Sequence, residues 1–158
     1  MPTSITACAR LLAKLGLRHH VDADEGVIWL VFVTREYKNL RGEHLAVVGL
    51  ETPDDGQRVR ACISRAFAPG DDPARICLTL CRHAAEIPLV AVEFDADQAD
   101  LRLVVEAAVE EGSLSASQLA AMIDRIVEAA EAWAPVVASL CGHPPAGSPA
   151  PNPKRGAA

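Results

Sequence analysis

The sequence has few aromatic residues and lacks a long hydrophobic run. Aromatic side chains make up only 4% of the 158 residues, although 50% of the residues are hydrophobic. No apolar stretch approaches the roughly 20 residues that a membrane-spanning helix needs. The N-terminal stretch does not resemble a signal peptide either, because no cation precedes its apolar residues and Arg10 and Lys14 interrupt them. We therefore expect a cytoplasmic protein with no membrane partner.

Reaction motifs and a disulfide pattern are also missing. The sequence has no GxSxG nucleophile elbow, no Walker A loop and no GxGxxG loop. Its five cysteines are an odd number, which argues against a framework of disulfides. These absences predict a protein that is not an enzyme and that carries no cofactor and no metal.

The charge balance is acidic, with a formal net charge of −6. The segment after Gly142 contains Lys154 and Arg155 but no acidic residue, so the rest of the chain is more acidic still. An acidic body repels a phosphate backbone. Nucleic acid is therefore not expected as a partner, although a local basic patch formed by Arg58, Arg60 and Arg65 leaves that alternative open.

Helical patterns occur in three stretches. They cover residues 4–15, residues 73–86 and the residues from 116 onward. Gly16 is a good stop for the first helix, and Pro73 occupies the first position of the second, where its missing N–H costs nothing. Ser115 and Gln118 form a capping-box pair that opens the third helix. Pro135 is expected to kink or end that helix.

Strand patterns lie between these helices. Strands are expected at 18–21, 27–33, 44–50, 58–64, 89–94 and 101–109. They come in adjacent runs rather than alternating with helices, which predicts the α+β class with a mainly antiparallel sheet. From residue 142 the chain is rich in proline, glycine and alanine, which is typical of disorder. We thus expect one domain over residues 1–141 and a disordered tail over residues 142–158.

The strand VIWLVFV, residues 27–33, is apolar on both of its faces. Such a strand needs cover on both sides, and three helices are few for that purpose. The uncovered face is expected to bind a protein partner. One candidate set is Trp29, Val31 and Val47, and the equal alternative on the other face is Ile28, Leu30 and Phe32.

Cys77 and Cys81 are four residues apart on the second predicted helix, with His83 two residues further on. Residues at this spacing share a helical face and could bind zinc if other ligands completed the site. The same face also carries Ile76 and Leu80, and free cysteine is among the most buried residue types. We therefore favour core packing of both thiols, with a metal-binding or thiol-dependent protein as the alternative.

Residues 71–137, from DDPARICLTL to EAWAPVV, resemble the C-terminal half of the YbjN family. That family belongs with the type III secretion chaperone-like fold of the Tir chaperone, or CesT, type. A helix leads into a strand, an acidic turn and a second strand, followed by a final helix with Trp133 just before Ala134 and Pro135. The resemblance extends over about residues 4–140.

The resemblance implies an α-β-β-β-α-β-β-α order with a curved, mainly antiparallel sheet packed against helices. It also implies a non-enzymatic protein, either chaperone-like or regulatory, that is often a homodimer. Type III chaperones of this fold wrap an extended client segment over apolar surfaces, and YbjN-like proteins are often named as sensory transduction regulators. No catalytic residue carries over, because the family supplies none. The alternative is a small metal-binding or thiol-dependent protein that uses Cys77, Cys81 and His83.

Overall fold

The computed structural model describes residues 3–109 and 114–141, and its centre is one antiparallel sheet. The strands are β1 (His20–Asp22), β2 (Val27–Val33), β3 (Leu45–Glu51), β4 (Arg58–Phe67), β5 (Val90–Asp95) and β6 (Asp100–Ala108). Their order across the sheet is β1-β2-β3-β4-β6-β5. Every neighbouring pair is antiparallel. Only β4 and β6 are neighbours that do not follow one another in the chain.

The three longer helices begin at, or one residue after, the positions that the sequence suggests, and two short helical turns accompany them. They are α1 (Ile5–Lys14), the single turn α2 (Pro53–Gly56), α3 (Pro73–His83), the 3₁₀ helix η1 (Ala84–Glu86) and α4 (Ala116–Cys141). The Asp72 side chain caps α3 by accepting a hydrogen bond from the Arg75 N–H at 3.0 Å. In the capping box of α4, Gln118 donates its N–H to the Ser115 hydroxyl at 3.1 Å, and Ser115 donates its N–H to the Gln118 side chain at 2.9 Å.

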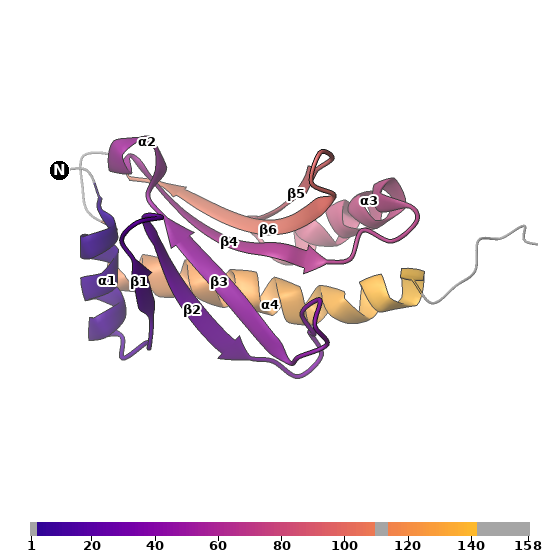
Figure 1. The fold of residues 1–158 in the computed structure, drawn as a ribbon, viewed down its shortest axis with the longest axis horizontal. Coiled ribbons are helices and arrows are strands. Elements are labelled where there is room, and N and C mark those ends of the chain that lie inside the picture. The colour runs from indigo at the N-terminus through magenta and orange to yellow at the C-terminus, as the bar shows by residue number, and fades with distance from the viewer. Residues whose placement is uncertain (1–2, 110–113, 142–158) are drawn as a thin grey trace, which may run out of the picture.

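The helices α1, α3 and α4 pack on the same face of the sheet, and Figure 1 shows α4 running behind it. This face supplies the hydrophobic core together with α4. Its buried residues include Ile28, Leu30, Val48, Leu50, Ala61, Ile63, Leu103 and Val105 from the sheet and Leu119, Ile123, Ile126 and Trp133 from α4. The opposite face, called the open face below, has no described helix packed across it, in keeping with the α+β class that the sequence predicts.

Two local details differ from what the sequence suggests. The turn expected at TPDDGQ contains the helical turn α2. Of the two outcomes expected at Pro135, a kink or an end, the helix does not end there but continues to Cys141. A proline inside a helix removes one backbone hydrogen bond. Here Val137, which is buried, and Leu140, which packs against the core, hold the residues beyond Pro135 in place.

Two further expectations concern the ends of the domain. No helix within residues 3–109 and 114–141 is long and apolar enough to cross a membrane. The predicted disorder of residues 142–158 lies outside the described residues. The domain boundary expected after residue 141 accordingly stays a prediction.

Candidate partner-binding face

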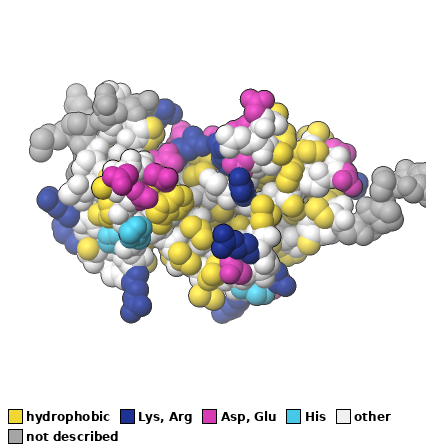
Figure 2. Space-filling model, in the orientation of Figure 1, with side chains coloured by type: hydrophobic (Ala, Val, Ile, Leu, Met, Phe, Trp, Pro, Cys, Tyr) yellow, Lys and Arg dark blue, Asp and Glu magenta, His cyan; other side chains and the backbone are white. Residues whose placement is uncertain are grey.

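The open face divides into two halves with different chemistry. The half formed by β2 and β3 presents an apolar stripe, which we define as Trp29, Val31, Val33 and Val47. Val31 is 58% exposed, Val33 is 86% exposed and Val47 is 39% exposed. Figure 2 shows hydrophobic side chains gathered over β2 and β3. Since Val31 pairs directly with Val47 across the two strands, the stripe is continuous.

Trp29 is the largest side chain in the apolar stripe, and Gly49 gives it space. The two residues are paired across β2 and β3, and Trp29 is half-buried. A Cβ atom added at Gly49 would lie 3.0 Å from the indole ring of Trp29. Because Gly49 has no side chain, the ring can lie close against the backbone of β3. The stripe thus has a flat aromatic surface at the end next to Gly49.

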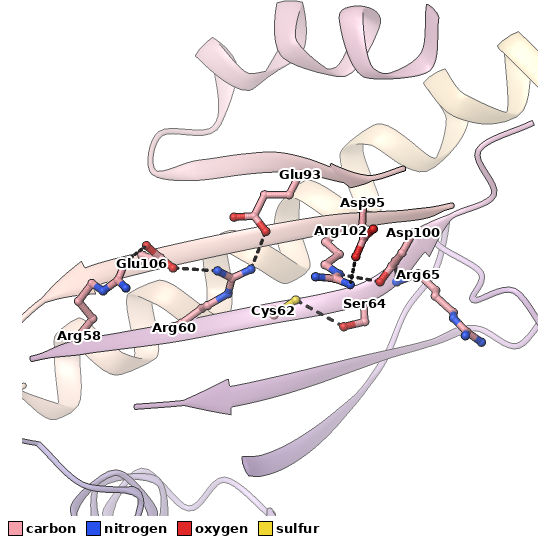
Figure 3. A network of polar contacts seen from close by, with 10 residues as sticks. All are labelled: Arg58, Arg60, Cys62, Ser64, Arg65, Glu93, Asp95, Asp100, Arg102 and Glu106. Atoms are coloured by element: carbon pink, nitrogen blue, oxygen red, sulfur yellow. Dashed lines mark hydrogen bonds and ion pairs between the residues drawn. The ribbon is translucent and has the colours of Figure 1, made fainter. Parts of the chain in front are cut away.

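The half formed by β4, β6 and β5 is instead an ionic network, which Figure 3 shows from close by. Arg60 on β4 forms ion pairs with Glu93 at 2.6 Å and with Glu106 at 3.1 Å. Arg102 on β6 forms ion pairs with Asp95 at 3.2 Å and with Asp100 at 2.6 Å. Each arginine lies between two carboxylates, which come from β5 and β6, so most of the charge on this half is paired within the chain.

Asp100 also organises a bulge in β4. The register between β4 and β6 shifts between Ile63 and Phe67, and Arg65 within the shift has a φ of 50°. Asp100 is only 4% exposed, and its second carboxylate oxygen accepts the backbone N–H of Arg65 at 2.7 Å. The carboxylate that pairs with Arg102 therefore also fixes the bulge. In Figure 3 the Arg65 side chain points away from the ionic network.

A cleft lies between the two halves. Only three residue pairs, from Gly49 to Glu51 on β3, join that strand to β4, and Figure 1 shows the two strands diverging beyond them. The cleft has a volume of about 450 Å³. It is lined by Tyr37, Asn39, Leu40, Arg41, Glu43, Val47, Ile63, Ser64 and Arg65. Because Val47 belongs both to the cleft and to the apolar stripe, the two surfaces are continuous.

The loop after β2 forms one wall of this cleft, and α4 holds it in place. The Glu131 carboxylate accepts three backbone N–H groups, from Arg35 at 2.6 Å, Glu36 at 2.7 Å and Tyr37 at 3.0 Å. Burial raises the pKa of Glu131, but these three donors and the charge of Arg35 outweigh it and hold the pKa below its ordinary value. The loop is thus fixed by an ionised side chain.

Tyr37 anchors the same loop in the core. Its ring packs edge-on against Phe67 of β4, with 5.8 Å between the ring centroids. Tyr37 is 1% exposed, and burial raises its pKa to about 12, so it remains protonated at neutral pH. The end of the cleft at Tyr37 is therefore held in place by the core.

The structure places the two candidate sets for partner binding on opposite faces. Ile28 and Leu30 lie in the core, and Phe32 is half-buried against it, so this set faces α4. Trp29, Val31 and Val47 lie on the open face. The sequence pattern alone could not choose between them, because both faces of β2 are apolar. The binding role of the exposed set stays a proposal.

The prediction that Cys77 and Cys81 are both buried is wrong. Cys77 is half-buried and Cys81 is exposed. Ile76 and Leu80 set the buried side of α3, and each cysteine follows one of them by one residue, which turns it about 100° around the helix axis. His83 turns away from the thiols and contacts the Glu86 carboxylate at 3.1 Å.

These positions give the thiols no metal site within the described residues. There, no three His, Cys, Asp or Glu side chains are arranged to hold a metal ion. Burial, and then the neighbouring Cys81, raise the pKa of Cys77, which disfavours the thiolate that metal binding and thiol chemistry require. Cys62 on the open face has a raised pKa as well, chiefly through burial. The metal or thiol alternative thus has no geometric support in this part of the chain.

Sequence reasoning found part of the ionic network and missed the rest. The alternation in residues 58–64 placed Arg58 and Arg60 on one side of a strand, and both contact Glu106. Their carboxylate partners come from strands far along the chain, so only the strand register could identify them. The contact of Asp100 with the bulge at Arg65 could not be predicted either, because no residue type there indicates a positive φ.

Comparisons with known proteins agree on this architecture. No protein-family model matches the chain, and no curated protein sequence does. A chain of the ExsC–ExsE complex matches with a TM-score of 0.59 and 17% identity, over 87% of this chain and 97% of that one. YbjN, a candidate transcription regulator from E. coli, matches with a TM-score of 0.59 and 12% identity, over 83% of this chain and 91% of that one.

A third solved structure extends the agreement to a chaperone with a bound protein fragment. It is the Yersinia pestis type III secretion chaperone SycH in complex with a stable fragment of YscM2. The match has a TM-score of 0.52 and 17% identity, over 81% of this chain and 97% of that one. The chain has the type III secretion chaperone-like fold. The resemblance to the YbjN and type III chaperone families noted in the sequence is confirmed at the level of fold.

Proposed function

We propose that the chain is a non-enzymatic protein-interaction module, chaperone-like or regulatory, which binds an extended segment of a partner protein on its open face. The observation that carries this proposal is the apolar stripe, exposed on a sheet whose other face is already packed against helices. The four large apolar side chains of the stripe, on two paired strands, favour a protein ligand. The shared fold supports the proposal, since solved neighbours include complexes with bound proteins.

The chemistry of the open face favours binding over catalysis. Its arginines and carboxylates are mostly engaged with one another, and the thiol of Cys62 is held in its neutral form by burial. A catalytic site would need ionisable groups converging on an accessible point with their charges available. The apolar stripe instead offers dispersion contacts and burial, which are the main sources of binding energy in a protein interface.

A second copy of the chain is the other candidate for this face. Homodimerisation was expected from the sequence, and light scattering at micromolar concentration would measure the mass directly. The cytoplasmic location expected from the sequence likewise stays a prediction. Neither expectation changes the surface that we propose to bind the partner.

A valine and a leucine with equal exposure provide a matched test. Val31 in the stripe and Leu78 on α3 are each 58% exposed. Proteins captured by the tagged full chain from its native cells should be identified by mass spectrometry, alongside the Val31→Asp and Leu78→Asp variants. We expect a specific protein to be retained by the wild type and by Leu78→Asp but lost with Val31→Asp. Capture that is equal for all three proteins would contradict the proposal.

A further inference from the structure

The cleft beside the apolar stripe contains two arginine side chains that have no ion-pair partner among the residues that the structure describes. Arg41 and Arg65 line it from opposite walls, the first on the loop after β2 and the second in the bulge of β4. Within residues 3–109 and 114–141 neither guanidinium forms an ion pair. By contrast, Arg60 and Arg102 on the same face each contact two carboxylates. The two halves of the face thus meet at a site where positive charge is left available.

The carboxylate in the cleft offsets only part of this charge. Glu43 lines the cleft with Arg41 and Arg65, but the amide of Asn39 donates a hydrogen bond to its carboxylate at 2.8 Å. The Asn39 side-chain oxygen in turn accepts the backbone N–H groups of Arg41 at 2.9 Å and Glu43 at 3.0 Å. Glu43 is therefore part of the turn that presents Arg41, and two cations remain against one engaged anion.

The backbone at Arg65 holds its side chain in an unusual direction. Its φ of 50° is in the left-handed region, which glycine or asparagine adopts more readily than arginine. A bulge of this kind re-aims the side chain of the extra residue. The buried carboxylate of Asp100 holds the bulge through the Arg65 N–H, and Arg102 holds Asp100. The structure thus fixes an arginine where the backbone alone would favour another residue.

We propose that this cleft binds an acidic side chain of the partner segment, with the adjoining apolar residues of that segment on Trp29, Val31 and Val47. Arg41 and Arg65 are its two cationic partners, since a planar guanidinium matches a carboxylate with two parallel hydrogen bonds. The continuity of cleft and stripe through Val47 sets the pattern of the ligand. It is an extended, apolar stretch with an aspartate or glutamate at one end. This inference rests on the proposed function and specifies its partner.

A displayed library of random 12-residue peptides, selected against the full chain, tests the pattern. The variants are Arg65→Asn, which suits the left-handed backbone, Arg41→Gln, and the two combined. Arg82→Gln is the matched control, because Arg82 is an exposed arginine on α3, away from the open face. The wild type and Arg82→Gln should enrich apolar peptides that carry an acidic residue. The double variant should keep the apolar preference and lose the acidic one.

The best wild-type peptide is then compared with its own glutamine-substituted form by fluorescence anisotropy. We expect the substituted peptide to bind roughly fivefold to tenfold more weakly to the wild type and equally well to the double variant. If the double variant does not fold, the single variant Arg41→Gln, on a surface loop, is tested with the two peptides in its place, and the same result is expected. Thermal melting of Arg65→Asn should show a midpoint equal to or above that of the wild type.

The outcomes separate this inference from the proposed function. Enrichment of apolar peptides without an acidic preference, or an acidic preference that the double variant retains, would overturn the inference and leave the proposed function standing. If the wild type enriches no peptides beyond those enriched by Val31→Asp, the proposed function fails, and this inference fails with it.

Discussion

On the half of the open face formed by β2 and β3, the exposed side chains are apolar and have nothing to pack against, whereas on the half formed by β4, β6 and β5 they are charged and paired. Both halves belong to one sheet and share one core on its other side. The paired half is compatible with water as it stands. The apolar half is stabilised only when another surface covers it and removes its side chains from water. This difference is why we propose binding on the half formed by β2 and β3 and treat the other half as a solvated flank.

The largest expected effect separates the two sides of β2. Leu30 is 1% exposed and its neighbour Val31 is 58% exposed. Leu30→Asp should destabilise the protein by at least about 4 kcal/mol, because it places an unpaired charge in the core. Val31→Asp should cost less than about 1 kcal/mol and leave the protein folded. Urea unfolding followed by circular dichroism measures both, and similar losses in the two variants would mean that the assignment of faces is wrong.

The next comparison lies within the ionic half. Asp100 is buried and has two partners, whereas the Glu93 side chain is 42% exposed and has one. Asp100→Ala should destabilise the protein by about 2–3 kcal/mol, since it removes one of the two carboxylates that pair with Arg102 and leaves the bulge N–H without its acceptor. Glu93→Ala should cost less than about 1 kcal/mol, as is usual for an exposed pair. Equal costs would show that the bulge does not depend on Asp100.

The loop that ends the apolar half depends on an ionised carboxylate on α4. Glu131→Gln should cost about 1–2 kcal/mol at neutral pH, because an amide oxygen cannot satisfy three backbone donors equally well. The folded-state pKa of Glu131 lies below its ordinary value of 4.5. Its contribution is therefore complete above that value and is lost as the pH falls through the lower folded-state pKa. Unfolding titrations should show a shallower acid dependence in the variant than in the wild type.

The smallest expected effect concerns the surface of the apolar stripe itself. Gly49→Ala would bring a methyl group within 3.0 Å of the Trp29 ring and push the ring outward. Stability should change by less than about 1 kcal/mol, because the ring lies on an open surface and can move. Acrylamide should quench the tryptophan emission more strongly, and the buried Trp133 should contribute little to that change. Unchanged quenching would mean that Gly49 does not seat the ring.

The helices and strands of the fold can be predicted from local sequence patterns, but their arrangement can be predicted only in part. The expected strand at 27–33 agrees with β2 residue for residue, and Ser115 with Gln118 marks the start of α4. Such features depend on neighbouring residues, which a single sequence displays. The last helix does not end at Pro135, because the packing of Val137 and Leu140 offsets a local penalty. Tertiary contacts of that kind are not visible in the residues around the proline.

The candidate site was predictable to a similar degree. Both faces of VIWLVFV are apolar, so the need for cover was evident, while the choice between Trp29 and Ile28 required the position of α4. The cleft could not be predicted from the apolar pattern of the strands. It depends on the divergence of β3 from β4 and on a bulge at Arg65, where a residue with a strong preference for other backbone conformations gives no hint of its geometry.

The helix α4, which packs on the sheet, is synthesised after the strands β2 and β3. Protein synthesis proceeds from the N-terminus at roughly 5–20 residues per second. The end of α4 at Cys141 therefore follows the end of β3 at Glu51 by several seconds. During that interval α4 is incomplete, so the core-facing side of VIWLVFV lacks part of its native cover while the open-face side is exposed as well. A short, uncharged, strongly β-prone segment in this condition is prone to cross-strand association with other chains. The nascent protein is thus most exposed to aggregation before its last helix emerges.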